Sequence, residues 1–148
     1  MSKALGKTTA YIVSGPEGLR SLQIPLIDAT VRAGIPEGAN ESFSKTALYN
    51  FLVKHPEHTY GLKAKGESMI GAGINDGDLM IVDRALKPRF DSILIFEIDN
   101  EYTVKHFERE DGHLFLVPAN PDFERLQVKS HQLCNAWGVV TFVLRSTY

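Results

Sequence analysis

The sequence predicts a mostly β domain with one or two short helices and an extended N-terminal arm. Beyond residue 56, short apolar runs alternate with turn residues, whereas helical spacing occurs only in a segment just before it. Runs of this length separated by turns are typical of antiparallel sheets. Six of them cover residues 59–64, 78–82, 92–98, 102–107, 113–117 and 137–144.

Turn chemistry between the runs supports this interpretation. Four groups of turn-forming residues fall between them: Asn75-Asp76-Gly77, Asp99-Asn100, Asp111-Gly112 and Asn120-Pro121. Asp-Gly pairs favour tight hairpins because both residues tolerate a positive φ. We therefore expect neighbouring runs to pair as antiparallel strands.

The N-terminal part of the chain lacks this pattern of apolar runs and turns. Residues 1–43 are rich in Gly, Pro, Ser and charge without a helical period, which predicts an extended arm. In the following segment, four side chains fall at helical spacing: Leu48, Phe51, Leu52 and His55. Ser42 or Ser44 is the expected N-cap of this helix, and Pro56 ends it.

Composition narrows the class of protein. The 148 residues carry 16 basic and 18 acidic side chains, a net charge of −2, and no basic run, which disfavours direct DNA binding. Cys134 is the only cysteine, so we expect neither an intramolecular disulfide nor a metal site, and no cofactor is indicated. No stretch approaches the apolar length of a membrane span. We expect a soluble cytoplasmic protein.

Ser68 is the first residue that could carry chemistry. It lies in Gly66-Glu67-Ser68-Met69, between a predicted strand and a loop, where its hydroxyl could be exposed. The alternative is that Ser68 caps a helical turn, since short motifs match by chance. A serine hydroxyl also needs an adjacent base to become a nucleophile.

Lys105 is the candidate base. Alternation places Thr103, Lys105 and Phe107 on one face of a strand. If that face points inward, desolvation could lower the lysine pKa by about 3 to 5 from about 10.4. The alternative is a surface lysine whose stem covers apolar area. The five histidines offer another base, but none has a recognisable triad context, and we expect them at the surface or at helix ends.

The extended arm contains a possible substrate. Val31-Arg32-Ala33-Gly34-Ile35-Pro36 includes a peptide bond between two very small residues, which can enter a narrow site as an extended strand. A flexible linker would explain the same composition without cleavage.

Taken in order, V-x-A-G-x-P, then G-x-S-M-x-x-x-G-I-x-D-G-D-L-x-I-V-D, then E-Y-T-V-K resembles the UmuD and LexA group of self-cleaving serine peptidases. The resemblance implies a compact, highly curved antiparallel β domain over residues 34–148 and an arm, residues 1–33, that self-cleavage removes. It implies Ser68 as nucleophile, Lys105 as general base and the Ala33-Gly34 bond as the cleavage site, with Val31 helping to recognise the arm. The backbone N–H groups of Glu67 and Ser68 would form the oxyanion hole.

The resemblance also implies partners. These are a second copy of the chain in a homodimer, a RecA filament on single-stranded DNA that stimulates cleavage, and a UmuC-like Y-family DNA polymerase subunit that acts with the truncated product in SOS mutagenesis and translesion synthesis. The UmuD branch fits better than a repressor, because no two-helix pattern precedes the cleavage site. Two alternatives stay open: a non-catalytic docking subunit for a polymerase or RecA, and a repressor-type regulator of the SOS response.

Overall fold

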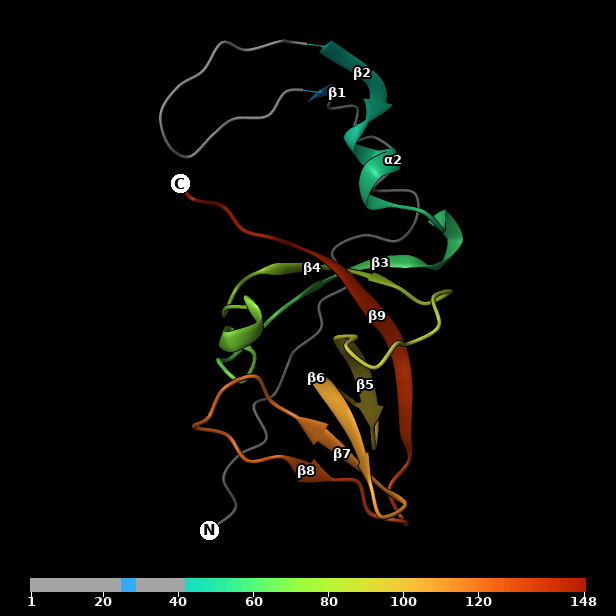
Figure 1. Ribbon diagram of the computed structural model, residues 1–148, viewed down its shortest axis with the longest axis vertical. Coiled ribbons are helices and arrows are strands. Elements are labelled where there is room, and N and C mark those ends of the chain that lie inside the picture. Colours follow the sequence, from blue (N-terminus) through green and yellow to red (C-terminus); the bar gives the residue numbers. More distant parts are fainter. Residues whose placement is uncertain (1–24, 29–41) are drawn as a thin grey trace.

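The computed structural model describes residues 25–28 and 42–148, with side chains from residue 48 onward. The main element of the described chain is a seven-stranded sheet in which every neighbouring pair is antiparallel (Figure 1). In spatial order its strands are β3 (Thr59–Lys63), β4 (Leu79–Asp83), β9 (Cys134–Leu144), β5 (Leu94–Ile98), β6 (Glu101–Glu110), β7 (His113–Val117) and β8 (Leu126–Gln127). The predicted mostly β fold is confirmed. Each of the six predicted runs overlaps one strand, and β8 is a seventh strand that was not predicted.

The long strand β9 makes the sheet curl. Its residues 139–144 pair with β4, whereas residues 134–139 pair with β5. Val139 stands at the crossing, opposite Asp83 on one side and Leu94 on the other. Register shifts interrupt both pairings, and such bulges increase local bending and twist. The single strand β9 therefore connects the half of the sheet that contains β3 and β4 to the half that contains β5 to β8 (Figure 1).

Two tight hairpins form the half of the sheet that contains β6. Asp99 and Asn100 join β5 to β6 with φ of 49° and 66°, and Asp111 and Gly112 join β6 to β7 with φ of 49° and 79°. A two-residue hairpin turn of type I′ needs positive φ at both positions, which Asp, Asn and Gly tolerate. The turn chemistry thus fixes the register of β6 against both neighbours.

The core consists of two apolar clusters that use opposite faces of β5. Ile95 belongs to the first cluster, whereas its neighbours Leu94 and Phe96 belong to the second, as period-two alternation requires. The first cluster contains Leu62, Ala64, Met69, Ile74, Met80, Val82, Ile95 and Val104. The second contains Leu94, Phe96, Leu116 and Val139. Strand β6 is therefore buried on both faces in its central part, and Lys105 lies there, opposite Leu94.

The predicted helix begins later than expected. The helix α2 spans Leu48–Leu52, and the residues before it form strand β2 (Ser42–Ala47), so the prediction of Ser42 or Ser44 as N-cap is wrong. Strand β2 pairs with β1 (Pro25–Asp28), and this antiparallel pairing satisfies backbone groups that would otherwise favour a helix. Pro56 then opens a 3-10 turn, η1 (Pro56–His58).

Strand β1 lies within the predicted arm. It is extended, as expected, but its pairing with β2 was not predicted from the sequence. None of the helices in the described part of the chain has the length and apolar character needed to span a bilayer.

The segment between β3 and β4 is closed at its base. The backbone N–H of Gly77 donates to Ala64 O at 2.9 Å, and the N–H of Ala64 donates to Asp78 O at 2.8 Å. The Asp78 side chain is only 2% exposed, and it accepts from Asn75 N and from both Nε and Nη2 of Arg145. The Arg145 hydrogen bonds hold the pKa of Asp78 below its ordinary value. A buried carboxylate thus anchors this segment to the chain beyond β9.

Arg145→Ala is expected to lower the melting temperature at pH 7 by several degrees, because it leaves a buried carboxylate without its cation. Since the folded-state pKa of Asp78 is depressed, its stabilisation is present above the unfolded pKa and is lost as the pH falls. The difference from wild type should therefore shrink toward pH 3 in thermal melts. Arg109→Ala, at an exposed arginine, is the matched control, and equal effects of the two variants would contradict the anchor.

Candidate active site

Ser68 lies in the turn between β3 and β4. The turn enters through Gly66, whose φ of +94° suits glycine and whose N–H donates to Asp76 Oδ1 at 2.7 Å. The following 3-10 turn, η2 (Ile70–Ala72), has Met69 at its N-cap and no side-chain cap. The interpretation of Ser68 as a helix cap is therefore wrong.

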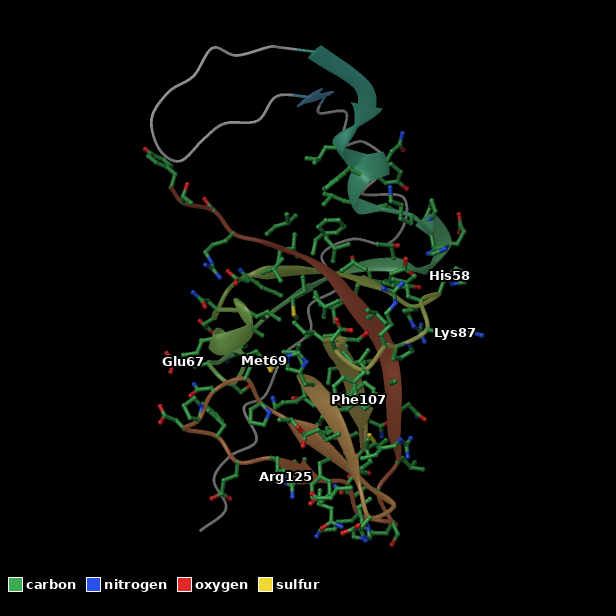
Figure 2. The ribbon with its side chains drawn as sticks, in the orientation of Figure 1. His58, Glu67, Met69, Lys87, Phe107 and Arg125 are labelled. Atoms are coloured by element: carbon green, nitrogen blue, oxygen red, sulfur yellow. The ribbon has the colours of Figure 1, made fainter. Side chains whose placement is uncertain are left out.

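The residue after Ser68 fixes the turn to the core. Met69 is 2% exposed and belongs to the first apolar cluster, whereas Glu67 is exposed at the outer side of the turn (Figure 2). Ser68 is half-buried between them. Insertion of Met69 thus turns the serine toward the sheet.

Lys105 ends beside this serine. The side chain comes from the buried centre of β6 and is 8% exposed, so the surface-lysine alternative is wrong. Its Nζ lies 2.8 Å from Ser68 Oγ, 3.0 Å from Val104 O and 3.1 Å from Thr103 Oγ1. The structure therefore brings a hydroxyl, which can act as a nucleophile, into direct hydrogen-bond contact with an amine, which can act as a base. The two residues are 37 positions apart in the sequence.

Burial changes the acidity of this lysine. Desolvation lowers the pKa of Lys105 from 10.5 to about 8. The direction of this shift is the one that the sequence predicted for an inward-facing lysine. A neutral amine is therefore more accessible near neutral pH than it is for a lysine at the surface.

Two backbone donors adjoin the Ser68 hydroxyl. Within the described chain, neither the N–H of Glu67 nor the N–H of Ser68 donates a hydrogen bond to another backbone group. Adjacent N–H groups in such a turn can bind a developing negative charge.

The histidines do not compete for this serine. His55 Nδ1 lies 2.6 Å from Asp83 Oδ2, and His106 Nδ1 lies 3.3 Å from Ser92 O. Among the described residues, Lys105 is the one side chain hydrogen-bonded to the Ser68 hydroxyl. His55 was expected to be a plain helix-end residue, and its pairing with a carboxylate that is 4% exposed was missed.

A cavity of about 590 Å³ lies elsewhere, under the loop between β4 and β5. Lys87 and Val139 are among its lining residues, and Ser68 and Lys105 are not. Lys87 lies on the opposite side of the molecule from Glu67 in Figure 2. The cavity is therefore separate from the Ser68–Lys105 contact.

The remaining predicted site residues, Val31, Ala33 and Gly34, lie outside the described residues. Sequence reasoning missed Thr103 and Asn120, which touch the site from β6 and from the β7–β8 loop. Thr103 could have been found, because alternation puts it on the same strand face as Lys105. Asn120 carries no such signal, because the pair Asn120-Pro121 is already explained by its position in a predicted turn.

Comparison with known proteins agrees with the resemblance noted in the sequence. A family described as "Peptidase S24-like" matches residues 25–141. The chain is 38% identical over 142 residues to Protein ImpA of Salmonella typhimurium and of Escherichia coli, covering 95% of this chain and 96% of each relative. It is 34% identical over 131 residues to the LexA repressor of Polaromonas sp., covering 88% of this chain and 56% of that protein.

Lys105→Met is expected to remove a pH dependence of stability. Because the folded-state pKa is lowered, the cost of burying the ammonium is fully present below pH 8 and disappears as the pH rises toward 10.5. From this group, the unfolding free energy of the parent should rise by roughly 2 kcal/mol between pH 7 and pH 9.5. Chemical denaturation of Ser68→Ala chains, with and without Lys105→Met, measures it, and Lys129→Met is the exposed control. If the unfolding free energy depends on pH in the same way with and without the lysine, Lys105 is not a buried cation.

Proposed function

Because the chain belongs to the Peptidase S24-like family, we propose that it is a serine endopeptidase that cleaves its own Ala33-Gly34 bond, with Ser68 as nucleophile and Lys105 as general base. The observation that carries this proposal is the 2.8 Å contact between Nζ and Oγ around a lysine whose pKa is lowered to about 8. A lysine of this kind holds a lone pair near neutral pH that a surface lysine lacks.

The first half of the reaction forms an acyl-enzyme. Neutral Lys105 Nζ accepts the hydroxyl proton of Ser68 while Oγ attacks the carbonyl carbon of Ala33. The carbonyl oxygen becomes an oxyanion, which accepts hydrogen bonds from the backbone N–H groups of Glu67 and Ser68. The carbon–nitrogen bond to Gly34 then breaks, and the Lys105 ammonium gives its proton to the departing amine. Ala33 is left as an ester on Ser68.

The second half regenerates the serine. Neutral Lys105 takes a proton from a water molecule, which attacks the ester carbonyl of Ala33. Collapse of the second tetrahedral intermediate returns the proton to Ser68 Oγ and releases residues 1–33. The products are this fragment and a chain beginning at Gly34.

We also propose the wider setting that the sequence resemblance implies. A RecA filament on single-stranded DNA stimulates the cut, and the truncated chain acts as a homodimer with a UmuC-like Y-family DNA polymerase subunit in SOS mutagenesis. The support is the ordered set of motifs around Ala33-Gly34, Ser68 and Lys105. Binding of the truncated chain to the polymerase, tested with purified proteins, separates this setting from the peptidase chemistry.

Ser68→Ala and Lys105→Ala are each expected to abolish self-cleavage, a loss of at least about a thousandfold, because either change removes a member of one reacting pair. Intact-mass analysis after alkaline incubation should show a fragment beginning at Gly34 from wild type and none from the variants. Ser130→Ala and Lys129→Ala, at exposed positions, are the controls. Truncation of the Ser68→Ala chain at the same bond would exclude this nucleophile.

The rate constant of self-cleavage is expected to rise about tenfold between pH 7 and a plateau above pH 9, with a midpoint near 8. The rise follows deprotonation of the Lys105 ammonium, since only the neutral amine accepts a proton. Time courses by mass spectrometry across this range measure it. A rate constant that stays flat from pH 7 to pH 10 would rule out lysine as the base.

A further inference from the structure

The loop between β7 and β8 grips the turn that carries Ser68. Asn120 in this loop is 7% exposed, and its Nδ2 donates to Glu67 O at 2.9 Å. Its Oδ1 accepts from the N–H of Asp122 at 3.0 Å, so both ends of the amide are engaged and its orientation is fixed. The contact bridges 53 residues of sequence and ends on the carbonyl directly before Ser68.

The residue before Asn120 holds the other side of the same turn. Ala119 O accepts from the N–H of Gly71 at 2.7 Å, and the Ala119 N–H lies 3.4 Å from Met69 Sδ. A Cβ added to Gly71 would come within 2.4 Å of Ala119 O, so the fit is close. Contacts at Glu67, Met69 and Gly71 thus bracket Ser68 on both sides.

The contact at Glu67 has a directional consequence. The Glu67 carbonyl and the Ser68 N–H belong to one peptide unit, which is planar and trans, so the two groups point in opposite directions. The Glu67 carbonyl accepts from Asn120 Nδ2 at 2.9 Å and from the N–H of Ile70 at 3.4 Å, so the shorter contact, from Asn120, is the main anchor that sets the direction of the Ser68 N–H. It also limits rotation of the backbone that carries the Ser68 side chain toward Lys105.

We propose that Asn120 is a positioning residue for self-cleavage, which orients the Glu67-Ser68 peptide so that the Ser68 N–H faces the developing oxyanion. This inference rests on the proposed peptidase function and adds a group that touches neither the substrate nor the proton in transfer. It acts through the carbonyl of Glu67.

Asn120→Ala tests the proposal through the pH profile of self-cleavage. The plateau rate constant should fall about 10- to 100-fold, because a misplaced oxyanion donor costs transition-state stabilisation. The midpoint near pH 8 should stay in place, since Lys105 keeps its buried surroundings. A loosened fold would instead hydrate Lys105 and move the midpoint to higher pH. Asn135→Ala, at an exposed asparagine, should leave the profile unchanged.

Two further variants sharpen the result. Asn120→Asp keeps the acceptor for Asp122 N but loses the Nδ2 donor, so it should be as slow as Asn120→Ala. Gly71→Ala pushes on Ala119 O and leaves the Asn120 side chain intact, so it should give the same loss of plateau, and it serves if the Asn120 variants do not fold.

A normal plateau in Asn120→Asp, or a plateau and midpoint that move together in Asn120→Ala, would overturn the proposal. A wild-type chain that does not cleave would instead overturn the peptidase function itself. The two failures are therefore distinguishable.

Discussion

A lysine side chain ends inside the core of this protein, with Nζ 2.8 Å from the hydroxyl oxygen of Ser68. Burying an ammonium group is costly unless acceptors surround it, and Lys105 has three of them: Ser68 Oγ, Thr103 Oγ1 and Val104 O. Three parts of the structure come together around this contact: the sheet, the turn between β3 and β4, and the loop between β7 and β8 that packs on the turn. The positions of all three are needed to keep the lysine buried and hydrogen-bonded.

Strand β6 supplies the lysine because it is buried on both faces at its centre. Two hairpin turns fix the register of β6. Along the neighbouring strand β5, successive side chains belong to two different apolar clusters, one on each face of the sheet, and these clusters cover β6 from both sides. The turn with the serine is then fixed by an apolar anchor, Met69, and by polar contacts to Ala119 and Asn120. The sheet and the turn therefore hold the Lys105 and Ser68 side chains in place, and a third segment, the loop between β7 and β8, contacts the turn that carries the serine.

The sequence predicts the strands well and the tertiary contacts poorly. Periodicity located six runs and the turns between them, because antiparallel strands and tight turns are determined by local chemistry. The predicted N-cap of the helix, Ser42 or Ser44, was wrong because the pairing of β2 with β1 is not local in the sequence. β8 has two residues, too few to show a period. The inward direction of Lys105 was open in the sequence, since alternation defines two faces without saying which is buried.

The position of β1 has a consequence for the products of the proposed cut. Strand β1 ends at Asp28 and its partner begins at Ser42, so scission between Ala33 and Gly34 would place the two hydrogen-bonded strands on different polypeptides. Bond breaking and departure of the short polypeptide would then be separate events. The second would have its own rate, set by how fast a four-residue strand peels from its neighbour, and it would leave behind an open edge along β2.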